Sequence, residues 1–216
     1  VRTLRQSKTF AFMEVNDGTF FKNLQVVMSE DALSDYKELV KTGVGASVKA
    51  TGTLVVTPDM PQPFELHATA VEVVGASGGD YPLHKNLHKL DYLRTIAHQR
   101  PRANLFQCAF RIRSLISQAT HKFFSEKGFV YVHTPLITGS DCEGAGEMFQ
   151  VTTLDLNNPP KTPDGKVDYN EDFFAKPVNL TVSGQLNVES FCMAFRNVYT
   201  FGPTFRAENS NTARHA

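Results

Sequence analysis

The last segment of the sequence, TFRAENSNTARHA at 204–216, holds the residues best suited to chemistry. Alternate side chains of a strand point to opposite faces, so Arg206 and Glu208 are predicted to share one face while Phe205 and Ala207 anchor the other. A guanidinium forks onto phosphate oxygens, and a carboxylate accepts a hydrogen bond from an amino group. The pair therefore predicts a nucleotide site. An exposed ion pair on an edge strand is the alternative interpretation of FRAE taken alone.

Two loops carry groups that suit the rest of such a ligand. The loop that follows Glu208 holds Arg214 and His215, which can close over a polyphosphate. The segment SDCEGAGEMF (140–149) has glycines that let the backbone approach a ligand, and its carboxylates, among them Glu143, suit a cationic group. A simple turn is the alternative interpretation of this glycine-rich segment.

The elements that must position these groups fill the second half of the chain. A strand leading into a helix is predicted at LTVSGQLNVES (180–190), which places Gln185 and Glu189 near a strand end, where ligands gather. In the earlier strand FVYVHTPLI, Pro135 indicates either an edge or interface strand or a simple terminator. Before it, apolar residues spaced by four and three predict a long amphipathic helix that ends at Gly128. These apolar residues are Leu105, Ala109, Ile112, Ile116, Ala119 and Phe123.

The first part of the chain predicts a small barrel of five strands. A helix with the apolar stripe Leu33, Tyr36 and Leu39 or Val40 is predicted between the third and fourth strands. In the fourth strand, Val48, Ala50, Leu54 and Val56 are expected on one face. The predicted strands are 1–5, 10–15, 22–28, 46–57 and 64–74, and the predicted helix is 31–41. This order is the one expected of an OB-fold, which binds oligonucleotides across its second and third strands.

Arg5, Phe12 and Gln25 are the barrel residues best suited to RNA. Phe12 can stack on a base, and Gln25 can both donate to and accept from a base edge. The alternatives are a core position for Phe12 and simple solvation for the other two side chains.

Two stretches between and beyond these elements have the composition of connectors. Residues 76–102 turn to Gly, His, Lys and Arg and predict a linker with one short helix around 87–96. Residues 151–178 are rich in Pro, Asn and Asp and predict an excursion on the surface, to which no chemistry is assigned.

Composition excludes several classes of protein. Lysine plus arginine equals aspartate plus glutamate at 22 each, so contact with nucleic acid would need a local basic patch. The three cysteines lie far apart without metal-ligand spacing, so no zinc site is predicted. No apolar stretch approaches the length of a membrane span and no leader precedes the first strand, so a cytoplasmic protein with no membrane partner is expected. Both ends read as cut, and a fragment is expected.

Taken in order, these segments resemble the class II aminoacyl-tRNA synthetases of the aspartyl, asparaginyl and lysyl subgroup, and most closely the asparaginyl branch. The resemblance covers the whole chain through GFVYVHTPLI, SDCEGAGEMF, SGQLNVES and TFRAENSNTARH. It implies an α+β chain with an OB-fold anticodon-binding domain at 1–75, a hinge at 76–103, and the first part of an antiparallel-sheet catalytic domain at 104–216.

The resemblance also implies roles for individual residues. Arg206 is expected to bind the ATP α-phosphate and the substrate carboxylate, and Glu208 the adenine amino group. Arg214 and His215 match residues that meet the γ-phosphate. The other implied roles are contact with the α-ammonium by Glu143 and Gln185, contact with the anticodon by Arg5, Phe12 and Gln25, and a homodimer interface at Pro135.

The amino acid substrate follows from one short segment. Aspartyl relatives carry a lysine three residues after the matching glutamine, where this sequence has Val188, followed by Glu189. A carboxylate at 189 would accept from the amide of asparagine and repel aspartate. Asparagine is therefore the expected substrate, and aspartate is the alternative.

The family's third motif and the acidic residues that hold Mg²⁺ are expected beyond residue 216, so this stretch alone is predicted to be inactive. The complete protein is expected to convert asparagine and ATP to an adenylate and then to charge tRNA(Asn). The alternatives are an RNA-binding module that acts only through its barrel and a relative that makes a small amide metabolite.

Overall fold

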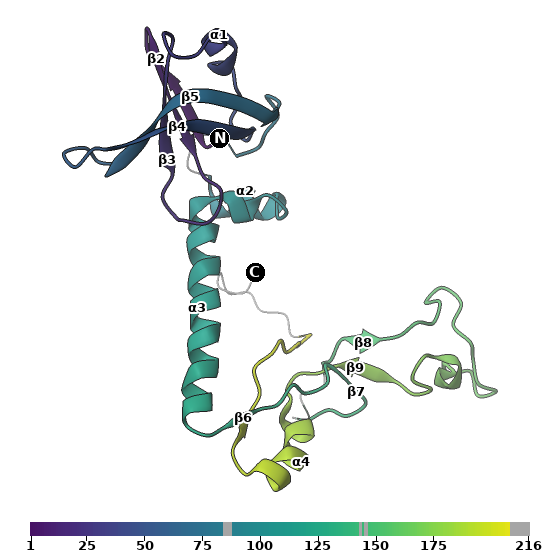
Figure 1. Ribbon diagram of the computed structural model, residues 1–216. Helices are drawn as coiled ribbons and strands as arrows, with labels where there is room; N and C mark the ends of the chain where they lie inside the picture. Colours follow the sequence, from purple (N-terminus) through teal and green to yellow (C-terminus); the bar gives the residue numbers. More distant parts are fainter. Residues whose placement is uncertain (84–87, 143, 145–146, 208–216) are drawn as a thin grey trace. The chain divides into compact units, whose positions relative to one another are not determined.

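The computed structural model describes residues 1–83, 88–142, 144 and 147–207. The chain divides into two compact units, Val1–Leu115 and Ile116–Ala216. Strands and helices occur in both units (Figure 1), which confirms the predicted α+β class. Among the described residues, no helix is long and apolar enough to cross a membrane.

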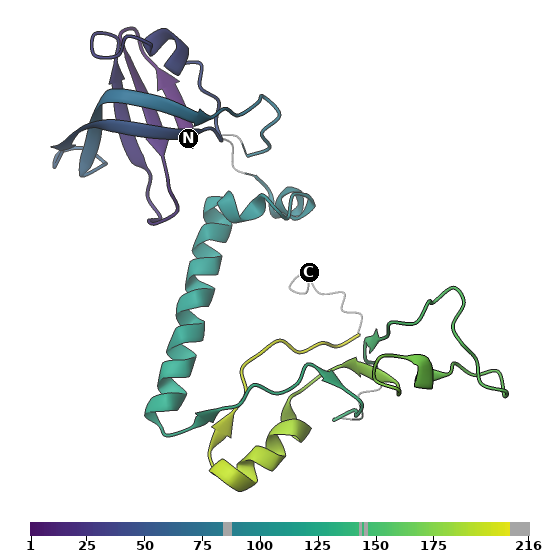
Figure 2. The same ribbon diagram turned by 45° about the vertical axis from the view of Figure 1, so that its right-hand side comes forward.

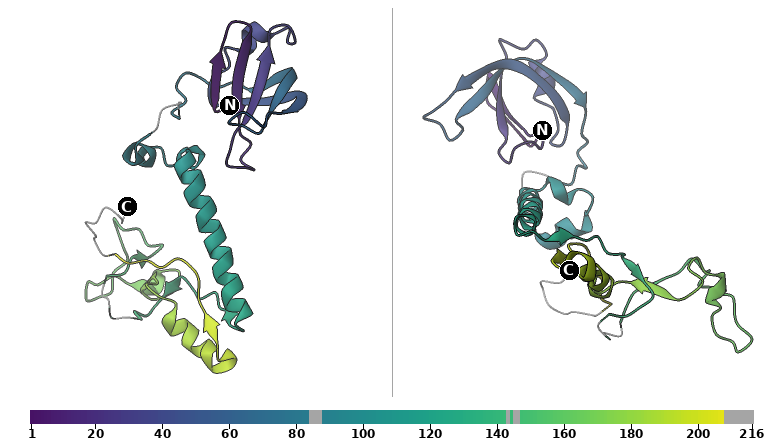
Figure 3. Two further views of the ribbon diagram at one scale, coloured as in Figure 1. Left: turned by 90° about the vertical axis from the view of Figure 1, so that its left-hand side faces the viewer. Right: turned by 60° about the horizontal axis from the view of Figure 1, so that its bottom comes forward.

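The first unit contains a five-stranded barrel sheet in the order β1-β2-β3-β5-β4. Its strands are β1 (Thr3–Gln6), β2 (Phe10–Val15), β3 (Leu24–Ser29), β4 (Ser47–Val56) and β5 (Phe64–Gly75). β3 and β5 pair in parallel, whereas the other neighbouring strands are antiparallel. The left view of Figure 3 shows the strands side by side. This topology confirms the predicted OB-fold.

The barrel core follows from the alternation of side chains along β2 and β3. Met13, Val26 and Met28 are fully buried, and burial of each such side chain contributes about 1.5–3 kcal/mol. The predicted helix 31–41 is too long: only α1 (Tyr36–Leu39) is helical. Its apolar stripe is nevertheless buried, because the turns before α1 already bring Leu33 beside Tyr36 and Leu39 in the core.

The pairing of β4 with β5 shifts register between Thr51 and Gly52, where Thr51 lies opposite Ala70 and Gly52 opposite Ala68. Before the shift, Val48 packs against the core with Ala50. Beyond it, Leu54 and Val56 are 58% and 73% exposed, so the shared face of β4 is covered by the core only in its first part. The physical reason is that β4 and β5 continue past the other strands as a hairpin (Figure 1), where no core is available to cover them.

Helical segments follow the barrel in the first unit. α2 (Leu90–Thr95) lies within the helix predicted around 87–96, and its Leu93 is only 2% exposed. A 3-10 turn, η1 (Arg100–Arg102), leads into α3 (Asn104–Glu126). The long amphipathic helix is therefore confirmed, and Gly128, with φ +78°, follows its end.

The second unit, which begins within α3, contains two small sheets. β6 (Val130–Tyr131) pairs in parallel with β10 (Val198–Tyr199), and a second sheet has the order β7-β9-β8. The remaining elements are β7 (Ile137–Thr138), β8 (Gln150–Val151), η2 (Tyr169–Glu171), β9 (Val178–Leu180) and α4 (Gln185–Phe195). The segment FVYVHTPLI is thus two short strands rather than one. The break occurs because β6 and β7 pair with different partners and Pro135, between them, has no N–H for a ladder.

Candidate nucleic-acid interface and candidate active-site segments

The outer face of the barrel brings the three predicted RNA-binding residues together. Arg5 of β1 lies opposite Phe12 of β2, which lies opposite Val27 of β3, which lies opposite His67 of β5. Residues directly opposite on neighbouring strands have Cβ atoms about 4.5–5.5 Å apart. One row of the face therefore combines a guanidinium, a half-buried aromatic ring and an imidazole.

A second row on the same face presents polar groups. Glu14 of β2 lies opposite Gln25 of β3, and the amide Nε2 of Gln25 donates to Glu65 Oε2 at 2.9 Å. The Arg5 guanidinium faces Glu14 at 3.7 Å, joining the two rows. Because the amide nitrogen of Gln25 is held by a carboxylate, the amide plane is fixed, as hydrogen-bond readout of a base edge requires.

Glu65 is a residue of this face that sequence reasoning missed. Its carboxylate lies 2.8 Å from His67 Nε2 and also accepts from Gln62 Nε2 at 3.3 Å. The hydrogen bond from His67, together with those from Gln25 and Gln62, lowers the pKa of the Glu65 carboxyl against an opposing effect of burial. The signal was present in FELHATAV, where Glu65 and His67 share a face, but their place beside Gln25 depends on the parallel pairing of β3 with β5.

In the second unit, the start of α4 is built by a tight polar turn that positions Gln185. Thr181 Oγ1 donates to the Ser183 carbonyl at 2.6 Å, and Ser183 Oγ accepts from the Gln185 N–H at 3.1 Å. Gly184 is required between them, because a Cβ there would lie 2.4 Å from Thr134 Oγ1. Gln185 is exposed as the first residue of the helix. Glu189 lies four residues later and is also exposed, so both occupy one face of α4.

Residues 203–207 run extended beside β9 (Figure 2), although they are not a strand as predicted. The Phe205 N–H donates to the Thr181 carbonyl at 2.9 Å, and the Ala207 N–H donates to the Glu147 carbonyl at 3.0 Å. Phe205 and Ala207 are half-buried while Arg206 is exposed, in agreement with the expected alternation. The contact with Thr181 brings the backbone around Arg206 to the segment that leads into Gln185.

The remaining predicted residues are placed only in part. Pro135 is exposed and follows Thr134, the residue whose side chain touches Gly184. Four predicted site residues lie outside the described residues, namely Glu143, Glu208, Arg214 and His215. The structure thus brings Gln185, Glu189 and the Arg206 segment into one region, and it leaves the other assignments as predictions.

Two family models match successive parts of the chain. Residues 1–74 match the model of the OB-fold nucleic acid binding domain, and residues 90–216 match that of the tRNA synthetases class II (D, K and N). The chain belongs to the class II tRNA synthetases. The resemblance seen in the sequence is therefore confirmed, and the second unit is part of a class II synthetase domain.

Individual synthetases show which branch of the family this chain is similar to. The asparagine–tRNA ligase of Acetivibrio thermocellus is 64% identical over all 216 residues, which are 47% of that protein. The asparagine–tRNA ligase of Desulfitobacterium hafniense is 63% identical over all 216 residues, which are 46% of that protein. The chain thus spans just under half the length of these curated relatives.

Solved class II synthetases confirm the fold. The asparaginyl-tRNA synthetase of Pyrococcus horikoshii, solved with asparaginyl-adenylate, superposes with a TM-score of 0.81 at 22% identity, covering 100% of this chain and 45% of that chain. The Entamoeba histolytica asparaginyl-tRNA synthetase gives 0.77 at 21% identity, covering 99% of this chain and 46% of the other.

Within this synthetase unit, Asp172 anchors the excursion at 151–178, to which the sequence assigned no chemistry. Its carboxylate accepts from Thr152 Oγ1 at 2.6 Å, from Thr153 Oγ1 at 2.8 Å and from two backbone N–H groups. The hydrogen bond from Thr152 is the largest of the effects that lower the pKa of Asp172. We assign this residue a structural role, because all of its acceptor positions serve the loop itself.

Proposed function

We propose that the protein containing this chain is an asparagine–tRNA ligase, which joins asparagine to the 3′-terminal ribose of tRNA(Asn) at the expense of ATP. The observation that supports this most strongly is the 60–64% identity to asparagine–tRNA ligases across every residue of the chain. The fold agrees, because it combines an OB-fold barrel with a class II synthetase unit.

The barrel is proposed to bind the anticodon. The Phe12 ring stacks on a base, Gln25 reads a base edge from its fixed amide, and Arg5 meets a phosphate. A Phe12→Ala variant should lose stacking worth about 1–3 kcal/mol, which weakens tRNA affinity by about 5- to 150-fold. Phe20→Ala is a matched control, because Phe20 is 65% exposed in the loop between β2 and β3, off the two rows. Equal effects of the two substitutions would contradict the assignment of the anticodon to this face.

The second unit is proposed to bind asparagine and ATP for the first reaction. The asparagine carboxylate attacks the α-phosphorus, the P–O bond to the β-phosphate breaks, and pyrophosphate leaves. Arg206 is proposed to hold the α-phosphate and the attacking carboxylate, and Gln185 and Glu143 are proposed to hold the α-ammonium. The ribose hydroxyl of the tRNA then takes the asparaginyl group and releases AMP.

The family also implies Mg²⁺. Among the described residues, no group of three histidine, cysteine or carboxylate side chains could hold a metal ion. These residues therefore do not fit the ion, and no step is assigned to it here. A homodimer through the Pro135 segment and a cytoplasmic location complete the proposal, and both rest on the resemblance to the family.

The choice of amino acid is proposed to depend on Glu189. Its position one turn after Gln185 lets the carboxylate accept from the side-chain amide of asparagine and repel the carboxylate of aspartate. Glu189→Gln should therefore lower kcat/KM for asparagine and narrow its preference over aspartate, measured by ATP–pyrophosphate exchange on the product of the complete gene. Ser190→Ala is the control, because Ser190 is the next residue of α4 and is also exposed. An unchanged preference in Glu189→Gln would contradict this role.

A further inference from the structure

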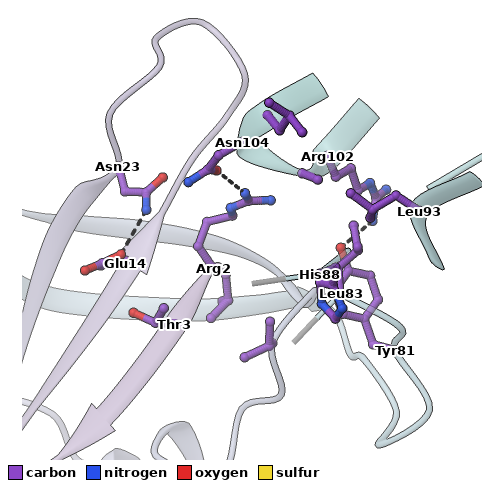
Figure 4. A pocket seen from close by; sticks show the side chains of 14 residues that line it. Arg2, Thr3, Glu14, Asn23, Tyr81, Leu83, His88, Leu93, Arg102 and Asn104 are labelled. Carbon is purple, nitrogen blue, oxygen red and sulfur yellow. Dashed lines mark hydrogen bonds between the residues drawn. The ribbon is translucent and has the colours of Figure 1, made fainter. Parts of the chain in front are cut away.

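A cavity of about 300 Å³ lies within the first unit beside the second row of the barrel face, whose Glu14 is part of its lining (Figure 4). Its walls include the start of β1, the side chains of Tyr81, Leu83, His88 and Leu93, and the first residues of α3. A volume near 300 Å³ is at the lower end of the range for small-molecule sites and is comparable to a single nucleotide. None of the predicted site residues lines it.

Two guanidinium groups reach this cavity. Arg2 donates through Nη2 to Asn104 Oδ1 at 2.7 Å, and Arg102 donates to the Tyr81 hydroxyl at 3.4 Å while its guanidinium carbon lies 6.0 Å from the centre of that ring. Figure 4 shows Arg2 and Arg102 reaching into the cavity from different elements. Neither contact is with a carboxylate, so these contacts do not neutralise the two guanidinium groups. Both can therefore bind an anionic ligand.

Glu14 is the carboxylate among the described side chains that line the cavity. It already accepts from Asn23 Nδ2 at 2.9 Å and faces Arg5 at 3.7 Å, so part of its charge is compensated outside the cavity. The first turn of α3 adds the positive end of a helix dipole, because its N–H groups have no partners within the helix. The balance of charge in the cavity is therefore positive.

Two polar atoms in the cavity wall lack partners. Thr3 Oγ1 and His88 Nε2 are buried and make no hydrogen bond within the described part of the chain. A buried polar group without a partner costs about 1–3 kcal/mol. A ligand that offers acceptor or donor atoms at these two positions would remove that cost. These atoms are a sign of an unfilled site that is independent of the two arginines.

The cavity is also bordered by apolar side chains and adjoins the predicted RNA face. Val44, Leu83 and Leu93 form an apolar wall, which suits a ribose or a base. A neighbouring hollow of about 280 Å³ is lined by Gln25, Phe21 and Lys22. Both spaces are lined by Glu14, Asn23 and Asn104, so they are continuous along the surface. An RNA strand that meets Gln25 can therefore reach Arg2.

We propose that this cavity binds one nucleotide of a bound RNA strand, with its phosphate between Arg2 and Arg102 and its sugar or base against Val44 and Leu93. The inference rests on the proposed function for the presence of RNA, and it adds a second contact beyond the anticodon face. A nucleotide held here would fix the direction in which the strand leaves the barrel.

The test measures binding of transcribed tRNA(Asn) to the product of the complete gene by fluorescence anisotropy over a range of salt concentrations. Loss of both charged contacts in Arg2→Ala/Arg102→Ala should weaken binding about tenfold or more. The slope of log K against log[salt] should also fall by about 1. Val44→Phe fills the cavity without changing charge and should weaken binding to a similar extent with an unchanged slope.

Arg94→Ala is the control for lost charge, because Arg94 lies in α2, pairs with Asp91 at 3.2 Å and does not line the cavity. It should change affinity less than twofold. An effect of Arg94→Ala equal to that of the double variant, or a parental affinity in Val44→Phe, would overturn the proposal. Titration with free AMP tests whether the cavity takes a free nucleotide instead of a nucleotide of the tRNA. If AMP binds the parent protein but does not compete with tRNA, the occupant of the cavity is not part of an RNA strand.

Asparagine-dependent ATP–pyrophosphate exchange on the same variants separates the two failures. If only the cavity proposal is wrong, the parent protein exchanges with asparagine while the cavity variants bind tRNA normally. If the proposed function is wrong, exchange with asparagine is absent in the parent as well. Circular dichroism of each variant identifies any that fails to fold, and the single substitution Arg102→Ala, on the exposed hinge turn, then replaces the double variant.

Discussion

Replacement of Gly52 by alanine should open the barrel at the point where β4 shifts register against β5. A Cβ at this position would lie 2.0 Å from the His67 carbonyl oxygen, 2.7 Å from the His67 carbonyl carbon and 2.8 Å from the Ala68 Cα. All three atoms belong to the backbone, so no change of rotamer relieves the overlap. The strands must separate by about 1 Å to restore an acceptable contact, which exceeds the range of a ladder hydrogen bond.

The expected cost adds overpacking, about 1–3 kcal/mol, to the loss of one ladder hydrogen bond, about 1 kcal/mol. The free energy of unfolding should fall by about 2–4 kcal/mol, which at a urea m-value of about 2 kcal/mol/M lowers the midpoint by about 1–2 M. Glu65 and His67 lie in the part of β5 that would be displaced, and Glu65 holds the amide of Gln25. The affinity for tRNA should therefore fall as well.

The assay is urea unfolding of the barrel followed by far-UV circular dichroism. Gly75→Ala is the matched control in the same pair of strands, because a Cβ there meets only the Ser47 Cβ at 3.7 Å. That variant should be neutral or more stable by up to about 1 kcal/mol, owing to a less flexible unfolded chain. Equal midpoints for Gly52→Ala and Gly75→Ala would refute the close approach of β4 to β5.

Three further predictions concern the second unit. Because the pKa of Asp172 is lowered from 3.8, its hydrogen bonds stabilise the fold above that pH and are lost as pH falls through the folded pKa. Asp172→Asn should therefore lower Tm at pH 7 and show a smaller further loss between about pH 4 and 2, in thermal melts across pH. Arg196 has φ +62°, and Asn197 donates to the Phe195 carbonyl across it at 2.7 Å, so Arg196→Gly should relieve strain and raise the free energy of unfolding by about 0.5–1 kcal/mol in urea titration. His121→Phe keeps the ring packing but removes the 2.7 Å hydrogen bond to the Tyr199 hydroxyl and should cost about 1 kcal/mol, whereas adding Tyr199→Phe should cost little more in a double-mutant cycle.

Much of the barrel follows from local patterns. Alternate residues of FAFMEV and LQVVM share one face of their strand, and Met13, Val26 and Met28 on that face are fully buried. The Leu33, Tyr36 and Leu39 stripe also identifies buried residues correctly, although it predicts too long a helix. Three apolar residues spaced by three are equally compatible with successive turns, and this ambiguity explains the error.

Features that depend on distant pairing could not be read in the same way. The exposure of Leu54 and Val56 depends on how far the other strands of the sheet extend beside the β4–β5 hairpin. Glu65 joins the face of Arg5, Phe12 and Gln25 only because β3 pairs with β5 across 40 residues of sequence. Asp172 resembles any other surface acid of a polar excursion until Thr152 and Thr153 are seen around it.

The two candidate sites differ in what the structure adds. For Arg5, Phe12 and Gln25, the registers of β1, β2 and β3 place the predicted residues on one face. For Arg206, the hydrogen bond from Phe205 to Thr181 brings its segment to the start of α4, near Gln185. The roles assigned to individual residues remain predictions, since they depend on bound substrates.

The most direct test of the proposed function is ATP–pyrophosphate exchange by the product of the complete gene, with asparagine, with aspartate and with no amino acid. The proposed function predicts exchange that depends on asparagine, with aspartate no better than the blank. Exchange driven by aspartate would contradict the role of Glu189 and move the protein to the aspartyl branch. An active-site titration showing no adenylate with either amino acid would contradict the ligase function itself and favour a protein that acts only through its RNA-binding barrel.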